Sequence, residues 1–210
     1  KSRLWQWQMN YAKLARNADK IIAVSNNTKQ DLVKLYRINS AKVSVIYEGV
    51  AAEYYSQPSQ AESAELKGKY QLPDEYLYYV GSLEPRKNIA MVVRGLRSIK
   101  DKGFDKIKLV ISSSKSWLAE DLNKEIEKLR LKDEIIFTGP VAEEEKIVLL
   151  HNASIFVFPS FYEGFGLPVL EAFAAKVPVI SSKISSIPEI AEGAAILVDP
   201  YNQTEFNQTL

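Results

Sequence analysis

The amino-acid sequence predicts an α/β fold in which a parallel β-sheet is flanked by helices. Short apolar runs alternate with amphipathic stretches over nearly the whole chain, and each apolar run has the length of a buried strand. Parallel strands need a crossover that is usually a helix, so this alternation indicates repeated βαβ units. The 210 residues are 46% hydrophobic and 25% charged, which is typical of a globular protein with a sizeable core.

The apolar runs and the amphipathic stretches between them give the order of the elements. Strands are expected at residues 20–24, 43–47, 77–80, 108–112, 135–138, 155–158, 177–181 and 195–198. Helices are expected at residues 26–36, 89–100, 116–131, 143–151 and 167–175. Ser25 stands where it would cap the first of these helices, and a last helix is expected to begin near Asn202. Residues 51–69 are expected to be a connector that is partly helical.

The first fifty residues begin with a segment rich in tryptophan and tyrosine. Leu4, Trp7, Tyr11 and Leu14 share one face of the helix that this segment predicts. Such a stripe suits a membrane surface or packing against protein, and packing is favoured because it is the commoner arrangement. We therefore expect these side chains to belong to a core.

Charge and cysteine content exclude several classes of protein. The 27 basic and 26 acidic residues are spread along the chain and give a net charge of +1, so there is no basic tract of the kind that binds nucleic acid. The chain has no cysteine, which removes disulfides and thiolate chemistry and favours a cytoplasmic location. His151 is the single histidine, and its helical setting favours a structural role over a catalytic one. No run approaches the roughly 20 apolar residues that span a bilayer.

The string EGFGLPVLE, residues 163–171, sets two carboxylates around a glycine-rich turn that follows an apolar strand. Pro168 suits the first turn of a helix, where a missing N–H costs nothing. The amides of that turn and the helix dipole would attract a phosphate. Glu163 and Glu171 would repel a phosphate, so they are better explained as acceptors for sugar hydroxyls. The string therefore predicts a nucleotide-sugar pocket.

A second string, GSLEPRKN at residues 81–88, follows a strand and precedes a helix. It is expected at the carboxyl end of a parallel strand, where α/β folds bind ligands. Lys87 offers a compact ammonium and Arg86 a planar guanidinium, and either can compensate the charge on a departing nucleoside diphosphate. The alternative is a solvated basic loop in which Arg86 points to solvent. The functional interpretation is favoured for both residues.

The chain resembles the retaining, group 1 glycosyltransferases of GT-B architecture, whose E-x7-E motif matches residues 163–171. The likeness runs from about Ile21 to the C-terminus through the segments VS at 24–25, YEGV at 47–50, YVGSLEPRKN at 79–88, FTG at 137–139, FPS at 158–160 and PE at 188–189. It implies a Rossmann-like donor-binding domain over residues 51–210, truncated at its C-terminus. Residues 1–50 would be the C-terminal remnant of an acceptor-side domain.

The resemblance also implies roles for single residues. Glu163 would contact hydroxyls of the donor sugar, Glu171 the nucleotide ribose, and backbone groups near Val141 the base. The other donor-binding residues that it implies are Gly81, Ser82 and the backbone amides of Phe165, Gly166 and Leu167. Many relatives carry an arginine where this chain has Ser82, and Arg86 is a candidate to replace it. Ser185, Ser186 and Glu189 would either approach the ligand or cap a short helix.

The function implied is transfer of a hexosyl unit from a nucleotide-diphosphate sugar to a hydroxyl acceptor, with retention. GDP-mannose is narrowly favoured over UDP-glucose and dTDP-rhamnose, and a growing surface polysaccharide is the expected acceptor. No cofactor or metal is expected, because the Asp-x-Asp pair that commonly holds a divalent ion in metal-dependent sugar transferases does not occur. The glycan or lipid-linked acceptor would be held by the missing domain, so the fragment alone is expected to be inactive. The whole protein is expected in the cytoplasm, with peripheral association at the inner membrane face allowed.

Two other classes compete with this interpretation. One is an epimerase or a phosphorylase built on the same architecture, since a fold alone does not fix a function. The E-x7-E spacing argues against both. The other is a nucleotide-sugar-binding module without turnover.

Overall fold

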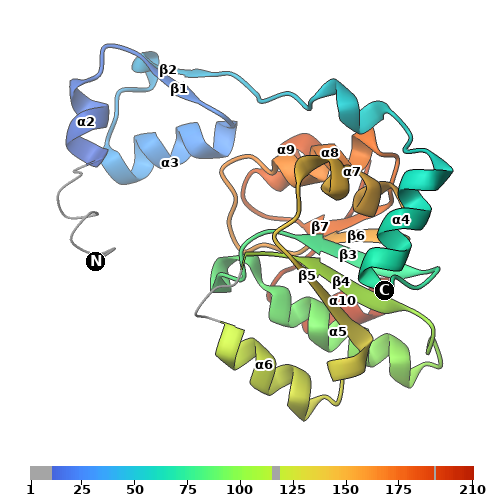
Figure 1. The fold of residues 1–210 in the computed structure, drawn as a ribbon. Helices are drawn as coiled ribbons and strands as arrows, with labels where there is room; N and C mark the ends of the chain where they lie inside the picture. The colour runs from blue at the N-terminus through green and yellow to red at the C-terminus, as the bar shows by residue number, and fades with distance from the viewer. Residues whose placement is uncertain (1–10, 115–118, 192) are drawn as a thin grey trace. The chain divides into compact units, whose positions relative to one another are not determined.

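The chain forms two units, which differ greatly in the size of their cores. The computed structural model describes residues 11–114, 119–191 and 193–210. Tertiary contacts separate a first unit, which ends at Glu48, from a second unit, Gly49–Leu210 (Figure 1). The six-stranded sheet and the large core belong to the second unit.

The second unit is built on six parallel strands in the order β5-β4-β3-β6-β7-β8. The strands are β3 (Tyr76–Val80), β4 (Lys108–Ser112), β5 (Ile135–Gly139), β6 (Ile155–Phe158), β7 (Val179–Ser182) and β8 (Ile196–Val198). The sequences YLYYV of β3 and IFVF of β6 are almost continuously apolar, because both faces of these central strands are covered. The prediction of a parallel α/β sheet is confirmed.

The sheet reverses its winding between β3 and β6. The chain starts at β3 and moves outward to β4 and β5, then returns across β3 to form β6 and moves the other way to β7 and β8. A crevice forms outside the carboxyl ends of strands at such a reversal, because the two loops diverge to opposite faces of the sheet. The loops after β3 and β6 are therefore the first place to look for a ligand site.

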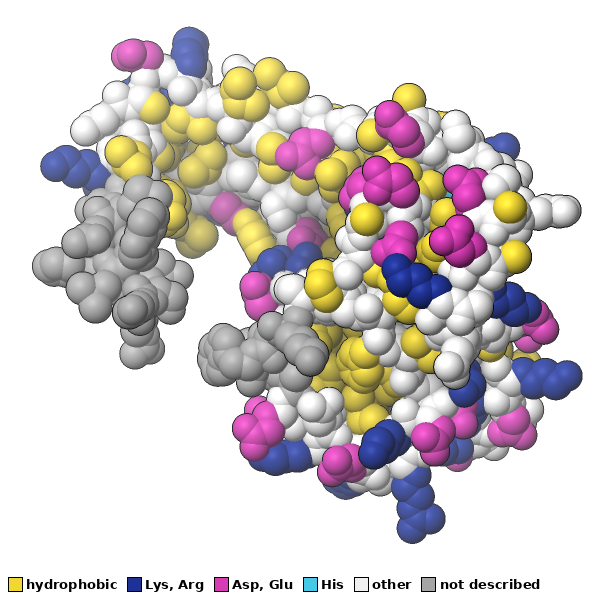
Figure 2. All heavy atoms as spheres, viewed as in Figure 1, with side chains coloured by type: hydrophobic (Ala, Val, Ile, Leu, Met, Phe, Trp, Pro, Cys, Tyr) yellow, Lys and Arg dark blue, Asp and Glu magenta, His cyan; other side chains and the backbone are white. Residues whose placement is uncertain are grey.

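Helices cover both faces of this sheet (Figure 1). One face carries α5 (Ile89–Asp101), α6 (Ala119–Lys128) and α10 (Gln203–Thr209), and α5 packs against both of the others. The opposite face carries α4 (Gln60–Tyr70), α7 (Glu143–His151), α8 (Leu167–Ala174) and α9 (Ile187–Ala191). The acidic first turn of α7 adds to a group of carboxylates on the α4 and α7 side of the molecule (Figure 2).

The first unit is a small αβ fragment. It contains α2 (Tyr11–Asn17), α3 (Asn26–Tyr36) and a two-stranded parallel sheet of β1 (Ile21–Ala23) and β2 (Val43–Val45). Ser25 caps α3 as predicted, since its hydroxyl accepts a hydrogen bond from the Thr28 amide at 3.0 Å. The buried cluster consists of Ala23, Ile38 and Val43.

The predicted aromatic stripe does not become core. Leu4 and Trp7 lie outside the described residues, while Tyr11 is 54% and Leu14 58% exposed. The small cluster of this unit draws on other side chains of α2, α3 and the strands, so Tyr11 and Leu14 are not part of the core that the described residues form.

Several element ends differ from the predictions for identifiable reasons. The helix expected at residues 116–131 is α6, which ends at Lys128 because Arg130 takes a left-handed conformation (φ 54°) and the Leu131 amide bonds back to the Ile126 carbonyl. Residues 116–118 lie outside the described residues. Strand β7 begins two residues late, after Pro178, which has no N–H to donate.

The connector expected at residues 51–69 is more ordered than its composition suggested. It forms a short 3₁₀ turn, η2 (Ala52–Tyr55), followed by α4. A capping box starts α4: the Ser59 hydroxyl accepts from the Glu62 amide at 3.2 Å, and the Glu62 carboxylate accepts from the Ser59 amide at 2.7 Å. None of the described helices is long and apolar enough to cross a membrane.

Candidate functional site

The loops after β3 and β6 meet through a buried ion pair. Lys87 ends the 3₁₀ turn η3 (Pro85–Lys87), and its Nζ lies 2.7 Å from Oε1 of Glu163 in the loop after β6. The two side chains are only 12% and 10% exposed. Nζ also lies 4.7 Å above the centre of the Phe158 ring, the last residue of β6, so the cation is held on an aromatic face.

Arg86 approaches the same carboxylate. Its Nη1 lies 3.2 Å from Oε2 of Glu163 and donates to the Tyr162 carbonyl at 2.8 Å. The alternative in which Arg86 points away into solvent is therefore wrong, although the side chain stays 39% exposed. Each carboxylate oxygen of Glu163 faces one cation.

Two serines fix the backbone of the Glu163 loop. The Ser185 hydroxyl accepts from the Glu163 amide at 3.1 Å and donates to the Glu163 carbonyl at 2.7 Å. The Ser186 hydroxyl lies 2.9 Å from the Glu163 carbonyl and 2.8 Å from the Phe165 carbonyl. Ser185 and Ser186, which the sequence predicts to approach the ligand or cap a helix, thus both bond this loop.

Gly166 begins α8 in a conformation that suits glycine. Its φ is 114°, and a Cβ built on it would lie 2.6 Å from Cδ1 of Ile187 and 3.0 Å from Cδ1 of Ile190. Pro168 occupies the first turn, as predicted. Phe165 is buried and Leu167 is half-buried, so the chain enters α8 closely packed against α9. Gly166, the N-cap of α8, lies three positions after Glu163, so the amino end of this helix is close to Glu163 along the chain.

Glu171 lies on α8 in a different setting. Its Oε1 accepts from Lys146 Nζ of α7 at 3.1 Å, and its side chain is 8% exposed. Its Oε2 is buried and has no hydrogen-bond partner among the described residues. Sequence reasoning missed Lys146, because nothing in its helix, EEEKIVLLH, distinguishes it from a solvent-exposed lysine.

The remaining predicted residues lie at strand ends of the same edge. Gly81 directly follows β3 with φ 149°, and the Tyr79 hydroxyl donates to the Ser82 carbonyl at 2.8 Å, which shapes this turn. Val141 follows β5 and precedes α7, the helix that carries Lys146.

Asn88, the last residue of the GSLEPRKN string, links several loops of the site. It adopts a left-handed conformation (φ 55°) between η3 and α5. Its side-chain amide donates to the Pro159 carbonyl at 3.1 Å and to the Pro200 carbonyl at 2.9 Å. It therefore ties the loops after β3, β6 and β8 together.

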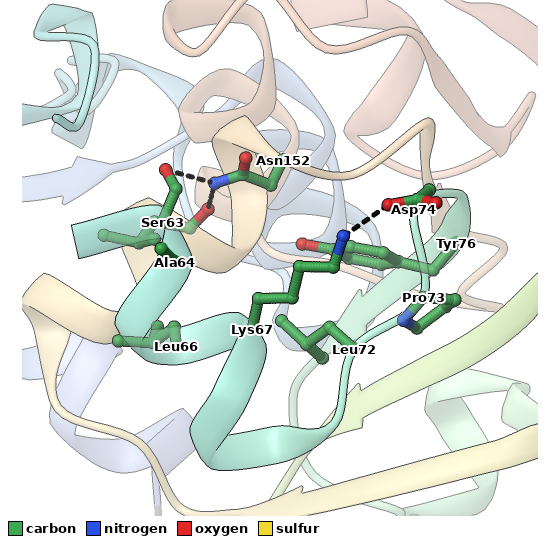
Figure 3. A pocket seen from close by; sticks show the side chains of 10 residues that line it. Ser63, Ala64, Leu66, Lys67, Leu72, Pro73, Asp74, Tyr76 and Asn152 are labelled. Atoms are coloured by element: carbon green, nitrogen blue, oxygen red, sulfur yellow. Dashed lines mark hydrogen bonds and ion pairs between the residues drawn. The ribbon is translucent and has the colours of Figure 1, made fainter. Parts of the chain in front are cut away.

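A pocket of about 300 Å³ lies elsewhere in this unit, at the opposite edge of the sheet (Figure 3). Its walls come from α4, the end of α7 and Tyr76, the first residue of β3. Lys67 pairs there with Asp74, and the Asn152 amide donates to the Ser63 hydroxyl at 3.1 Å (Figure 3). We take as the site the carboxyl ends of β3 and β6, called here the switch-point edge, because the buried Lys87–Glu163 pair lies there.

The switch-point edge combines three recognition elements. Lys87 and Arg86 supply cationic donors, the amino end of α8 supplies backbone donors, and Glu171 supplies a buried acceptor oxygen. Cations and helix amides suit a phosphate group, whereas a carboxylate oxygen suits a hydroxyl. A ligand carrying both groups fits this arrangement.

Comparison with known proteins agrees with this geometry. The family model "Glycosyl transferases group 1" matches residues 62–210, which include every residue of the site described above. The chain belongs to the group 1 glycosyltransferases. A second model, "Glycosyltransferase Family 4", matches residues 1–54.

Two curated relatives of this group 1 glycosyltransferase are named O-antigen chain mannosyltransferases. The chain is 31% identical to O-antigen chain mannosyltransferase B of Escherichia coli, over 88% of this chain and 48% of that protein. It is 30% identical to O-antigen chain mannosyltransferase RfbU of Salmonella typhimurium, over 90% of this chain and 49% of that protein. The chain thus spans about half the length of these two relatives.

Solved structures share the fold. A glycosyltransferase from Rickettsia africae superposes with a TM-score of 0.82 at 23% identity, over 95% of this chain and 55% of that one. Anabaena HepE in complex with UDP and glucose superposes with a TM-score of 0.81 at 19% identity, over 94% of this chain and 54% of that one. At these identities the likeness concerns the fold alone.

Proposed function

We propose that this group 1 glycosyltransferase moves a hexosyl unit from a nucleotide-diphosphate sugar to a hydroxyl acceptor, with retention. Residues 51–210 would bind the donor, and residues 1–50 would belong to the acceptor-side domain. The observation that carries the proposal is the buried Lys87–Glu163 pair at the switch point, beside the amino end of α8. A cation and a carboxylate at one edge suit the phosphate and the sugar of such a donor.

The proposed chemistry assigns Lys87 and α8 to the leaving group. An ammonium carries three N–H donors, and Glu163 accepts one of them. The proposal gives the others to the diphosphate, whose negative charge grows as the glycosidic bond breaks. The first-turn amides of α8 would share that charge through the positive end of the helix dipole.

Glu163 would position the sugar and would not attack it. Its two oxygens face Lys87 and Arg86, and these cations withdraw charge from the carboxylate. A carboxylate so engaged is a poor nucleophile but still accepts hydrogen bonds from hydroxyls. The acceptor oxygen would therefore bond to the sugar carbon on the face that the diphosphate leaves, and the hydroxyl proton would pass to the departing phosphate oxygen.

GDP-mannose leads narrowly as the donor, and a growing surface polysaccharide as the acceptor. The names of the Escherichia coli and Salmonella relatives support mannose transfer onto a bacterial glycan. UDP-glucose is the main alternative, since HepE of the same fold is described in complex with UDP and glucose. The base would be read by backbone groups near Val141.

Calorimetric titration of the chain with GDP, UDP and dTDP, and with their sugars, tests the donor site. We expect one of the three nucleotides to bind. Lys87→Met should weaken the binding of that nucleoside diphosphate by about tenfold or more, because a charge-assisted hydrogen bond is worth about 1.5–3 kcal/mol. Lys67→Met is the matched control, since Lys67 pairs with Asp74 at the opposite edge of the sheet.

Three outcomes would contradict parts of the proposal. Tighter binding of UDP than of GDP would remove GDP-mannose from the lead. Equal losses of nucleotide affinity in Lys87→Met and Lys67→Met would contradict binding of the diphosphate at the switch point. A folded chain that binds none of the three nucleotides would contradict a donor site within residues 51–210.

A further inference from the structure

Glu171 belongs to a polar cluster that reaches beyond the site described above. Lys146 Nζ lies 3.1 Å from Oε1 of Glu171 and 2.9 Å from Oε1 of Glu143. It also lies 5.1 Å above the centre of the Tyr54 ring. The Tyr54 hydroxyl donates to Glu143, which closes the cluster. The four residues come from η2, α7 and α8.

Tyr54 acts as a fixed neutral donor in this cluster. It is 2% exposed, and burial, together with its hydrogen bond to Glu143 and the nearby Glu171 charge, raises the pKa of Tyr54 far above its usual value. Burial alone would raise the pKa of Glu143 as well. The hydrogen bonds from Tyr54 and Lys146 outweigh that effect, so the pKa of Glu143 lies below its usual value. Glu143 therefore stays ionised and pairs with Lys146 at 2.9 Å.

The cluster restrains a side chain that is normally mobile. A lysine side chain has about four rotatable bonds, and fixing them costs conformational entropy. Here Nζ is held by two carboxylates and one aromatic ring, and the side chain is only 16% exposed. Tyr54 and Glu143 therefore help to set its direction toward Glu171.

Glu171 is left with one oxygen engaged and one available. Lys146 takes Oε1, whereas Oε2 is buried without a hydrogen-bond partner among the described residues. A buried carboxylate oxygen without a donor costs free energy, so its orientation has to be imposed by the groups around it. The ion pair at Oε1 imposes it, and Oε2 is thereby aimed as an acceptor for a ligand hydroxyl.

We propose that Lys146 is a positioning residue for recognition of the nucleotide ribose, and that Tyr54 and Glu143 hold it in place. The inference rests on the donor site proposed above for Glu171. It adds that the segment just after the boundary between the two units, η2, forms part of the support of that site, since η2 packs against α8. The ligand group concerned is the pair of hydroxyls on the ribose ring.

The test compares nucleotides with and without ribose hydroxyls. Calorimetry would measure binding of GDP and UDP, and of their 2′,3′-dideoxy counterparts, to wild type, Lys146→Met and Glu171→Ala. For the nucleotide that binds, we expect Lys146→Met to weaken the ribose form by about tenfold and the dideoxy form hardly at all, as coupled neighbours do. A purely structural role would weaken both forms equally.

Lys69→Met is the matched control. Lys69 pairs with Glu145 of α7 and lies 5.0 Å above the Tyr70 ring, so it repeats the carboxylate and aromatic contacts of Lys146 without touching Glu171. We expect this variant to bind both forms as wild type does. Lys146→Arg keeps a cation beside Glu171 and is expected to recover part of the preference for ribose. Tyr54→Phe is a milder variant, because it keeps the ring and removes only the donor to Glu143. Its affinity for the ribose nucleotide should fall by about threefold.

The outcomes separate this inference from the donor site itself. If Glu171→Ala loses the preference for ribose while Lys146→Met and Tyr54→Phe keep it, the positioning role is wrong and the donor site stands. If Lys146→Met weakens both forms alike, the role is structural and the inference is overturned. If the folded wild type binds no nucleotide, the donor site and the inference fall together.

Discussion

At the scale of single residues, the two carboxylates of one nine-residue string have opposite surroundings. Glu163 faces two cations, one at each oxygen. Glu171 shares one lysine with Glu143, and its other oxygen is buried without a hydrogen-bond partner in the described part of the chain. Both are about nine-tenths buried, and a buried charge costs free energy unless it is paired. Each carboxylate therefore depends on lysines from other elements, Lys87 after β3 and Lys146 on α7.

Gly166 is the residue at which substitution should be most revealing. Gly166→Ala would place a methyl group 2.6 Å from Cδ1 of Ile187. It would also force the backbone of an alanine to adopt a φ of 114°. We expect a loss of about 2–4 kcal/mol in the free energy of unfolding, as backbone strain and overpacking each cost about 1–3 kcal/mol. Urea denaturation would measure it.

Gly103→Ala provides the comparison for this prediction. Gly103 also has a positive φ of 91°, but a Cβ there would meet nothing within 4 Å. Its substitution should cost only the backbone strain, about 1 kcal/mol. Equal losses for the two variants would show that packing against α9 does not constrain the start of α8.

At the scale of elements, helix packing decides what each helix can tolerate. Helices α5 and α10 lie side by side beneath the sheet, and Gly95 of α5 is where they approach each other (Figure 1). A Cβ on Gly95 would lie 2.5 Å from Cε1 of Phe206 and 2.7 Å from Cδ1 of Leu210. This glycine is explained by a neighbour more than a hundred residues later in the chain.

Gly95→Ala is expected to destabilise the protein despite its helical position. Alanine gains up to about 1 kcal/mol over glycine inside a helix, but the clash with the buried Phe206 ring should cost about 1–3 kcal/mol. The matched control is Gly68→Ala in α4, where a Cβ would meet nothing within 4 Å and should stabilise by about 0.5–1 kcal/mol. Thermal or urea unfolding that stabilised both variants would contradict close packing of α5 on α10.

At the scale of the whole molecule, the two units differ in how much they can stabilise themselves. The second unit buries six strands between two layers of helices. Among its described residues, the first unit buries a cluster of Ala23, Ile38 and Val43, and leaves Ile22 67% and Leu35 72% exposed. A segment of fewer than fifty residues with so small a core gains little free energy from burial.

Hydrogen-exchange rates should therefore differ between the two units, on either side of the boundary between Glu48 and Gly49. We expect peptides from α3, β1 and β2 to exchange much faster at pH 7 than peptides from β3, β4 and β6, because local opening free energy follows buried apolar contact. Mass spectrometry of peptic fragments would measure this. Equal protection in both units would mean that the first unit has stability its own core does not explain.

The sequence by itself determined the order and kind of most elements. Strand β4 and helices α3 and α7 begin and end where periodicity places them, since apolar period and capping are local properties. Lys87 and Glu163 were also identifiable from their motifs and from their places after predicted strands. The family followed from the same motifs.

Only the tertiary structure decided which of these residues touch. The order of the six strands brings Lys87 and Glu163 together across 76 positions of sequence. Lys146, Tyr54 and Asn88 carried no local signal, because their importance comes from partners on other elements. Periodicity reports which face of an element is buried, whereas side-chain pairing depends on how the elements are arranged in three dimensions.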